Sequence, residues 1–342
     1  YSGLDKLFAV VKGNAYGHGQ NLVVSVLNKS KSIYGYQVYE LFEALELRKI
    51  TTKPLAVLGF LPNDKNLIRQ ASQAKITVPI YNQQTAKLLQ NSRKPLQVQI
   101  KVDIGTHRLG FKPENIVTLI QTLNKNKHLT IRGVFSHYAD SENNDQSFTN
   151  KQSKVFAALL TQLKQQNINL PFNHVACTAA MAKKISPHLT TGRLGIGLYG
   201  ISPIEGPLQS KLRPVLTWST KIMHLQQIPK GEYVGYARRY RTSRKMHIAT
   251  VPVGYYDGYS RSLSNNGQVL LAGRKKGVIG AVCMNMMMVE ADKNSKIGQR
   301  VTLIGRQKAK HISATDMATL AGTINYEIVT RLHPEIKRLL VA

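Results

Sequence analysis

The chain has 342 residues, enough for about two domains, and its 42% hydrophobic and 19% charged residues exclude a disordered, collagen-like or coiled-coil protein. No apolar run approaches the ~20 residues of a membrane-spanning helix, so we expect no membrane span in this chain. The formal net charge is +29, but the basic residues are spread along the whole chain without an RNA-binding, zinc-finger or basic-zipper signature. A nucleic-acid partner is therefore not expected.

Eight short apolar, β-branched runs in the first two hundred residues predict strands. They are 7–11, 33–38, 55–58, 76–80, 96–102, 131–136, 172–176 and 194–199. Amphipathic segments that predict helices lie between them, such as 40–49, 84–89, 116–123 and 154–163. Because such strands pair in parallel through crossover helices, the pattern predicts an α/β fold, a TIM (β/α)8 barrel. A doubly wound sheet is disfavoured, because the first turn carries a lysine and a tyrosine in place of a glycine-rich phosphate turn.

After Pro214 the pattern changes to strand-like runs separated by turn residues. These runs are 215–228, 246–253, 269–271, 278–282, 286–289 and 301–304. They predict a mainly antiparallel β domain. A short helix over 314–320 is predicted by Ser313 and Asp316, which have the spacing of an N-terminal cap. We therefore expect two domains, 1–212 and 213–342.

The turn after the first predicted strand carries the most informative motif. It reads Ala-Val-Val-Lys-Gly-Asn-Ala-Tyr-Gly-His-Gly over 9–19, and Lys12 stands where the strand ends. The carboxyl ends of barrel strands form active sites, so this position suits a reactive lysine, although a single lysine there is most often solvated. The full string, however, resembles almost residue for residue the pyridoxal-phosphate lysine motif of the alanine racemases, which usually have alanine in place of Gly13.

A second motif covers 101–111, after the fifth predicted strand. Considered alone, Lys101 and Arg108 are two neighbouring cations, which Coulomb repulsion disfavours. The segment resembles the one in which the alanine racemases carry a lysine that is often carbamylated and an arginine that holds the substrate carboxylate. The resemblance thus implies a possible carbamate on Lys101, which would turn repulsion into an ion pair, and substrate binding by Arg108.

Further motifs follow in the order of this family, at 135–139, 174–178, 193–200 and 324–327. The resemblance implies that pyridoxal 5′-phosphate is the cofactor, in a protein of fold type III. It implies the cofactor-binding residues Lys12, Tyr16, His137, Thr178, Arg193, Gly195, Ile196 and Tyr326. Cys177 departs from the asparagine that the family usually has.

The β domain carries three motifs of the same family. The segment 234–237 resembles the stretch with the second catalytic base, which is Tyr236 here. The segment 254–261 places Tyr255 and Arg261 at positions that line the substrate entrance, and 282–285 places Met284 at a substrate-binding position. The departures are Ala237, Ala281 and Asn285, where the family has glycine, arginine and aspartate.

The resemblance implies an isomerase, an alanine racemase that supplies D-alanine for peptidoglycan and cell-wall biogenesis. In that family L- and D-alanine interconvert by two-base proton transfer through a pyridoxal-phosphate aldimine. Lys12 would exchange the α-proton of the D-enantiomer and Tyr236 that of the L-enantiomer. The family's tyrosine comes from the partner subunit, so a homodimer with shared active sites is implied.

Two other functions compete with this one. The departures Cys177, Ala281 and Asn285 motivate a serine racemase or a racemase of broad specificity, as the cytoplasmic part of a larger membrane protein whose start precedes Tyr1. A non-catalytic pyridoxal-phosphate carrier is the alternative from a different class, although such a carrier needs neither the β domain nor Tyr236. The two cysteines form no disulfide framework and no metal-binding spacing, so we expect no metal and a cytoplasmic location.

Overall fold

The computed structural model describes residues 6–185 and 191–341, and the chain divides into two compact units. The first unit comprises Tyr1–Ala15 and Gln20–Leu212, and the second comprises Tyr16–Gly19 and Arg213–Ala342. The second unit therefore includes a short piece of the turn that follows Lys12. Within the described ranges, no helix has both the length and the apolar character needed to cross a membrane.

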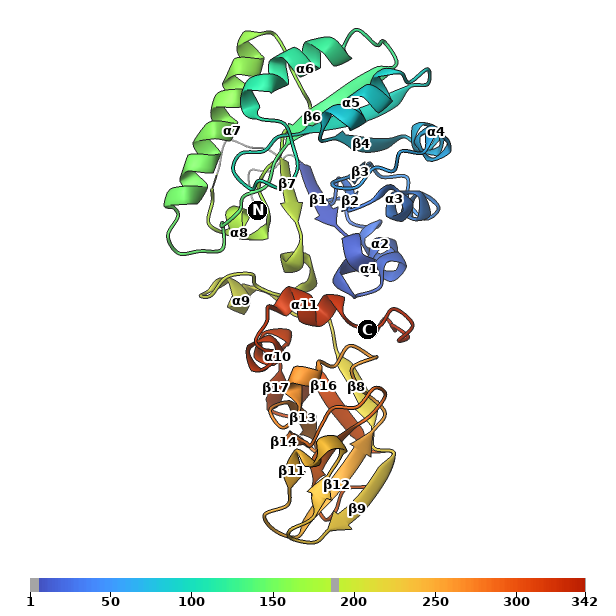
Figure 1. Ribbon diagram of the computed structural model, residues 1–342, viewed down its shortest axis with the longest axis vertical. Coiled ribbons are helices and arrows are strands. Elements are labelled where there is room, and N and C mark those ends of the chain that lie inside the picture. The colour runs from blue at the N-terminus through green and yellow to red at the C-terminus, as the bar shows by residue number, and fades with distance from the viewer. Residues whose placement is uncertain (1–5, 186–190, 342) are drawn as a thin grey trace. The chain divides into compact units, whose positions relative to one another are not determined.

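Seven parallel strands form the sheet of the first unit, in the order β6-β5-β4-β3-β2-β1-β7 (Figure 1). They are β1 (Lys6–Val10), β2 (Gly35–Val38), β3 (Leu55–Val57), β4 (Ile76–Ile80), β5 (Leu96–Lys101), β6 (Leu129–Phe135) and β7 (Thr191–Leu194). The helices are α1 (Lys12–Tyr16), α2 (Gln20–Leu27), α3 (Leu41–Arg48), α4 (Lys65–Gln73), α5 (Gln83–Gln90), α6 (Ile116–Leu123), α7 (Ser147–Gln165), α8 (Thr178–Ala182) and α9 (Leu208–Lys211), with 3-10 turns η1 (Pro113–Asn115) and η2 (Ile196–Tyr199).

The segment 172–176 closes the barrel between β6 and β7. The Phe172 amide donates to Arg132 O at 2.9 Å, and His174 forms a parallel bridge with Phe135. On the other side, the Arg193 amide donates to Ala176 O at 3.1 Å. The segment thus takes the place of the remaining strand, and the predicted α/β barrel is confirmed.

The prediction of a strand over 194–199 is wrong. The strand β7 ends at Leu194 and the chain turns into η2. The reason is local: the Gly195 amide donates to Thr178 Oγ1 at 3.1 Å and is lost to the sheet ladder. An apolar run with two glycines therefore forms a turn at the carboxyl end of the barrel.

The second unit is a mainly antiparallel β domain, as predicted. Eight strands form one sheet in the order β17-β16-β13-β14-β15-β12-β9, with β8 paired to β16, while β10 and β11 form a separate ribbon. The strands are β8 (Trp218–Lys221), β9 (His224–Ile228), β10 (Tyr233–Val234), β11 (Tyr240–Arg241), β12 (Met246–Val251), β13 (Gln268–Leu271), β14 (Arg274–Ile279), β15 (Met287–Ala291), β16 (Arg300–Gln307) and β17 (Lys310–Ile312).

Four short helical elements complete the second unit, η3 (Tyr236–Arg238), η4 (Arg261–Leu263), α10 (Ala314–Ala321) and α11 (Asn325–Thr330). The cap predicted for the helix over 314–320 is confirmed. Ser313 Oγ accepts from the Asp316 amide at 3.0 Å, and the Asp316 carboxylate accepts from the Ser313 amide at 2.8 Å. The run predicted over 215–228 is two strands, because β8 pairs with β16 whereas β9 pairs with β12.

The close approach of Gly133 to the closing segment gives a test of the barrel closure. A Cβ at Gly133 would lie 1.7 Å from Phe172 O, so Gly133→Ala forces β6 away from 172–176. We expect the thermal transition to fall by about 5 °C or more, as overpacking by 1–3 kcal/mol implies. The control is Gly277→Ala on β14, where the nearest atom to a Cβ is Glu290 Oε2 at 3.8 Å. Equal melting of both variants, followed by circular dichroism, would contradict the closure.

Candidate active site

The turn that follows Lys12 has a left-handed backbone conformation. After β1, Gly13, Asn14, Ala15 and Tyr16 all have φ between +53° and +60°. A left-handed conformation costs roughly 1–2 kcal/mol per residue for side chains with a Cβ, whereas glycine avoids this cost. Gly13, which replaces the usual alanine, therefore relieves part of the strain at the residue next to Lys12.

Hydrogen bonds with residues of the following helices hold this strained turn in place. Asn14 Oδ1 accepts from the Gln20 amide at 2.8 Å, and Gln20 Nε2 donates to Val11 O at 3.0 Å. Glu43 Oε1 of α3 accepts from the Gly13 amide at 2.8 Å, while its Oε2 accepts from the Tyr39 amide at 2.8 Å. The same carboxylate thus caps α3 and fixes the residue beside Lys12.

Cations gather around Lys12 and Lys101 at the carboxyl ends of β1 and β5. Burial lowers the pKa of Lys12, and the charges of Arg108 and Arg193 lower it further against the opposing pull of Glu43. Burial, followed by the same two arginines, holds the pKa of Lys101 well below its usual range. The Lys101 ammonium lies 4.7 Å from the Phe135 ring centroid. A site with this charge favours neutral lysines and anionic ligands.

Arg193 organises the interior of the barrel at this level. Its Nη2 donates to Ser136 O at 2.8 Å and to His137 Nδ1 at 2.9 Å, and its Nη1 donates to His174 Nδ1 at 2.7 Å. Because a guanidinium only donates, both histidines accept through Nδ1 and carry their protons on Nε2. Burial, then the charge of Arg193, holds the pKa of both histidines well below the usual range, so they stay neutral.

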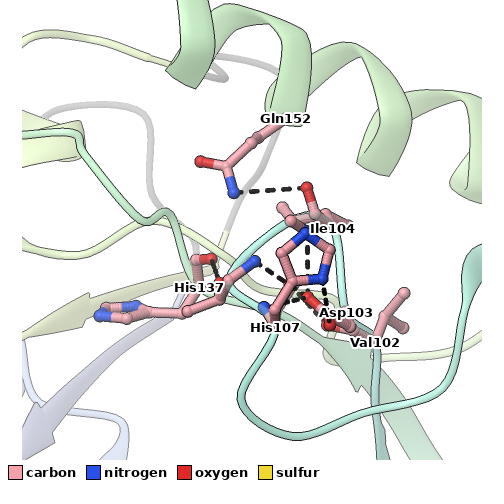
Figure 2. A network of polar contacts seen from close by, with 9 residues as sticks. Val102, Asp103, Ile104, His107, His137 and Gln152 are labelled. Atoms are coloured by element: carbon pink, nitrogen blue, oxygen red, sulfur yellow. Dashed lines mark hydrogen bonds and ion pairs between the residues drawn. The ribbon is translucent and has the colours of Figure 1, made fainter.

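A polar network fixes the loop that carries Arg108 (Figure 2). Burial by itself raises the pKa of Asp103. However, Asp103 Oδ1 accepts hydrogen bonds from the Gly105, Thr106 and His107 amides, and because these bonds lower the pKa by more, the pKa is lowered overall. Thr106 Oγ1 donates to His137 O at 2.9 Å, and Gln152 Nε2 of α7 donates to Ile104 O at 3.3 Å. The loop is therefore tied to the end of β6 and to α7.

Thr178 and the turn at η2 form a set of donors suited to a phosphate. Thr178 Oγ1 accepts from the Gly195 amide at 3.1 Å and from the Gly197 amide at 3.4 Å. A hydroxyl that accepts two N–H groups still has its own O–H proton to donate. Ile196, between these glycines, is fully buried. The structure thus brings the predicted Thr178, Gly195 and Ile196 together.

The second unit brings together four more of the predicted residues in two pairs. The rings of Tyr16 and Tyr326 have centroids 6.1 Å apart. The Tyr255 amide donates to Cys283 O at 3.0 Å, which places Tyr255 beside the segment of Met284. Arg261 begins η4, and its side chain is exposed.

Tyr236 begins η3 of the second unit, and its side chain is 72% exposed. Asn265 holds this turn, because its Nδ2 donates to Arg239 O at 2.9 Å and its Oδ1 accepts from the Gly280 amide at 2.6 Å. Lys12 belongs to the first unit and Tyr236 to the second. The two predicted bases therefore come from different units of the chain.

Three polar residues of the first unit were not predicted from the sequence. Glu43 caps α3 and bonds the Gly13 amide, His174 accepts from Arg193, and Gln99 Oε1 faces His174 Nε2 at 3.1 Å. A signal existed for Gln99, since a glutamine inside an apolar strand is unusual and requires a buried partner. For Glu43 there was none, because an acidic residue in the first turn of a helix is common.

The arrangement is a barrel with a largely buried lysine of lowered pKa just after its first strand, and comparison with known proteins specifies the class of protein. Residues 2–203 match the family model for the alanine racemase N-terminal domain, and residues 215–340 match that for the alanine racemase C-terminal domain. The chain belongs to the alanine racemase family. This family comprises pyridoxal-phosphate-dependent amino-acid racemases, which are isomerases.

Individual proteins agree with this assignment. The alanine racemase of Halothermothrix orenii is 36% identical over 97% of this chain and 89% of its own length. The crystal structure of alanine racemase from Bacillus anthracis with bound L-Ala-P has a TM-score of 0.88 at 33% identity, covering 97% of this chain and 87% of that chain. The alanine racemase structure from E. faecalis has a TM-score of 0.91 at 29% identity, over 98% and 91% of the two chains.

The charges around Lys12 give a test with two opposite signs. In the cofactor-free protein, we expect Arg108→Gln to raise the pKa of Lys12, because it removes a repelling cation, and Glu43→Gln to lower it. The pH dependence of Lys12 acetylation, followed by mass spectrometry, measures both shifts. Acetylation of the exposed Lys65 is the internal control and should be unchanged in both variants. Shifts of the same sign would contradict the electrostatic assignment.

Proposed function

We propose that this chain is an alanine racemase that binds pyridoxal phosphate at Lys12 and supplies D-alanine for peptidoglycan. The observation that carries the proposal is the gathering of Lys12, Lys101, Arg108 and Arg193 within one site where burial and mutual repulsion lower the lysine pKa values. Such a site binds anions, and the cofactor's phosphate and the substrate's carboxylate are both anionic. The two family domains, both matched, argue against a single-domain carrier.

The donors present fit this cofactor. Thr178 with the amides of Gly195 and Ile196, and Tyr16 with Tyr326, would hold the phosphate. His137 would pack beside the ring, and Arg193 would donate to the pyridine nitrogen. Bound to the amino group of an amino acid, pyridoxal phosphate withdraws electrons from the α-carbon and makes its proton acidic.

The chain's own task is to move one proton on each face of the α-carbon. A neutral amine accepts a proton, and the lowered pKa of Lys12 favours that form. We assign Lys12 to the α-proton of the D-enantiomer and Tyr236 to that of the L-enantiomer. Arg108 would bind the substrate carboxylate, and Arg193, always charged, would disfavour a proton on the pyridine nitrogen.

Lys101 has the chemistry required for carbamylation. Its pKa is held well below the usual range, so the neutral amine is available to attack carbon dioxide. The nitrogen forms a bond to the carbon, one N–H proton leaves to solvent, and the product carries one negative charge. We propose that this carbamate pairs with Arg108, which replaces the repulsion of two cations by attraction.

We further propose a homodimer in which Tyr236 of one subunit acts with Lys12 of the partner. Tyr236 is 72% exposed and Met284 is 53% exposed, an unusual state for groups proposed to contact substrate. Burial against a second subunit would supply the surroundings that both lack. Tyr255 and Arg261 would line the substrate entrance. The cytoplasm is the proposed location, since Cys177 and Cys283 are free thiols.

A broader substrate range is the second candidate, as a serine or broad-specificity racemase. Ala281, at the position of the family's arginine, is 1% exposed, and its amide nitrogen would lie 3.5 Å from a Cβ at Gly235. A small buried residue therefore stands beside the turn of Tyr236. Racemisation rates compared across alanine, serine and lysine decide between the two ranges.

The two-base assignment is tested by Tyr236→Phe. The variant loses one hydroxyl, so fold and cofactor binding should persist while racemisation falls by about 10²–10⁴ or more. In deuterated water it should still exchange the α-proton of D-alanine and fail to exchange that of L-alanine. The matched control is Tyr233→Phe on β10, which removes the same hydroxyl from an exposed tyrosine without a proposed role in the site. Equal exchange of both enantiomers in Tyr236→Phe would exclude it as the second base.

The shared site is tested by mixing two inactive variants, Lys12→Ala and Tyr236→Phe. Half of the randomly assembled dimers are mixed, and one of the two sites in each has both bases, so about a quarter of wild-type activity should return. The control mixes Lys12→Ala with Lys12→Met, which lack the same base and should stay inactive. If mixed dimers form without regaining activity, each site draws both bases from one chain.

A further inference from the structure

A cavity of about 540 Å³ lies at the amino-terminal end of the barrel strands, the end opposite to Lys12 and Lys101. Its walls include Tyr34 just before β2, Leu55 at the start of β3, Lys75 just before β4 and Gln97 near the start of β5. Its volume falls in the range of small-molecule sites. None of the residues proposed above for catalysis or cofactor binding lines it.

The charge of the cavity is of one sign. Arg48, Lys75 and Arg132 line it, and no aspartate or glutamate does so among the described residues. The Lys6 ammonium lies close by, 5.2 Å from the Phe172 ring centroid. A cavity with three cations and no carboxylate attracts an anion.

Arg132 owes its place to a bulge in β6. In the pairing of β5 with β6, Val98 faces Ile131 while Gln99 faces Gly133, so Arg132 is the extra residue. Bulges redirect a side chain, and this one places the guanidinium carbon 4.7 Å from the Phe172 ring centroid. Arg132 Nε is buried and has no hydrogen-bond acceptor within the described part of the chain, as is also true of Arg48 Nε. A buried donor without an acceptor destabilises the folded protein, and a ligand that supplies the acceptor would remove this cost.

Aromatic rings form the apolar part of the same cavity. Phe8, Tyr34 and Phe172 contact one another, with ring centroids 5.3 Å, 5.4 Å and 6.1 Å apart. Edge-to-face and tilted rings of this kind leave surfaces that favour a flat organic group. Cations beside aromatic rings therefore match a ligand that has both an anionic and a flat apolar part.

Hydrogen bonds connect the inner wall of the cavity to Arg193. His174 and Gln99 line it, and His174 Nε2 faces Gln99 Oε1 at 3.1 Å. On its other side, His174 Nδ1 accepts from Arg193 at 2.7 Å, and Arg193 also donates to His137. A ligand that contacts His174 or Gln99 therefore acts on a side chain bonded to Arg193.

We propose that this cavity is a second binding site, for a small organic anion with a phosphate or carboxylate on a flat apolar body. Arg132, Lys75 and Arg48 bind the anionic group, and the aromatic cluster packs on the ring. Occupancy changes the hydrogen bond of His174 to Arg193 and so reaches the active site. The binding step is independent of whether the chain racemises alanine.

The test uses the pyridoxal-phosphate-loaded protein, whose own phosphate site is filled, with adenosine monophosphate as the probe in calorimetry. We expect one binding event per chain, with Arg132→Gln and Lys75→Gln each weakening it by about tenfold or more, since each removes a charged donor. The matched control is Arg69→Gln on α4, an exposed arginine outside the cavity, which should bind as wild type does. Adenosine and inorganic phosphate should each bind more weakly than the probe, because each lacks one half of it.

Coupling is measured separately by nuclear magnetic resonance of ¹⁵N-labelled histidine. The resonance of His174, assigned by its loss in His174→Gln, should shift with adenosine monophosphate, and the same concentration of adenosine should shift it less because adenosine binds more weakly. Equal affinity for the probe in wild type, Arg132→Gln and Lys75→Gln, or no binding at millimolar concentration, overturns the site. If inorganic phosphate binds as tightly as adenosine monophosphate, the ligand needs no flat organic body. If the His174 resonance does not shift when the probe is bound, the cavity is not coupled to Arg193.

Discussion

The buried guanidinium of Arg193 is the interaction on which the rest of the barrel interior depends. It donates to the carbonyls of Ser136 and Val175 and to the Nδ1 atoms of His137 and His174. Burial is the largest cause of the lowered pKa of His137, His174 and Lys101, and the permanent charge of Arg193 is the next largest cause for each of them. The same guanidinium also lowers the pKa of Lys12, after burial and the charge of Arg108.

The second constraint is the strained turn after β1. Its left-handed backbone is unfavourable for Asn14, Ala15 and Tyr16, and hydrogen bonds from Gln20 and Glu43 hold it in place. Glu43 also attracts the charge of Lys12, so one carboxylate acts on both the backbone and the electrostatics of the site. The turn also belongs to both compact units: its residues up to Ala15 are part of the first unit, and Tyr16–Gly19 are part of the second. Arg338 of that unit donates to Gly17 O at 2.9 Å.

The alternation of apolar runs and amphipathic segments was enough to predict the barrel, because the inner strands are buried on both faces whereas each helix buries one face. The hydrophobic pattern does not predict local structure where backbone groups form hydrogen bonds with side chains. The run 194–199 has the composition of a strand. However, the Gly195 and Gly197 amides donate to Thr178 Oγ1 and not to a neighbouring strand, so the chain forms a turn. The bulge at Arg132 was equally invisible, since an extra residue in one strand leaves no mark on the hydrophobic pattern.

The sequence by itself determined the fold class, the order of the motifs and the resemblance that named Lys12, Tyr236 and Arg193. These are properties of local pattern, which a chain carries whether or not it is folded. Only the tertiary structure decided which polar groups meet. Glu43 and Gly13 are thirty residues apart and His174 and Gln99 seventy-five, and their contacts exist because the barrel closes. The lowered pKa values and the cationic cavity at the opposite end of the strands arise from that closure, because burial and Coulomb repulsion act through space and not along the chain.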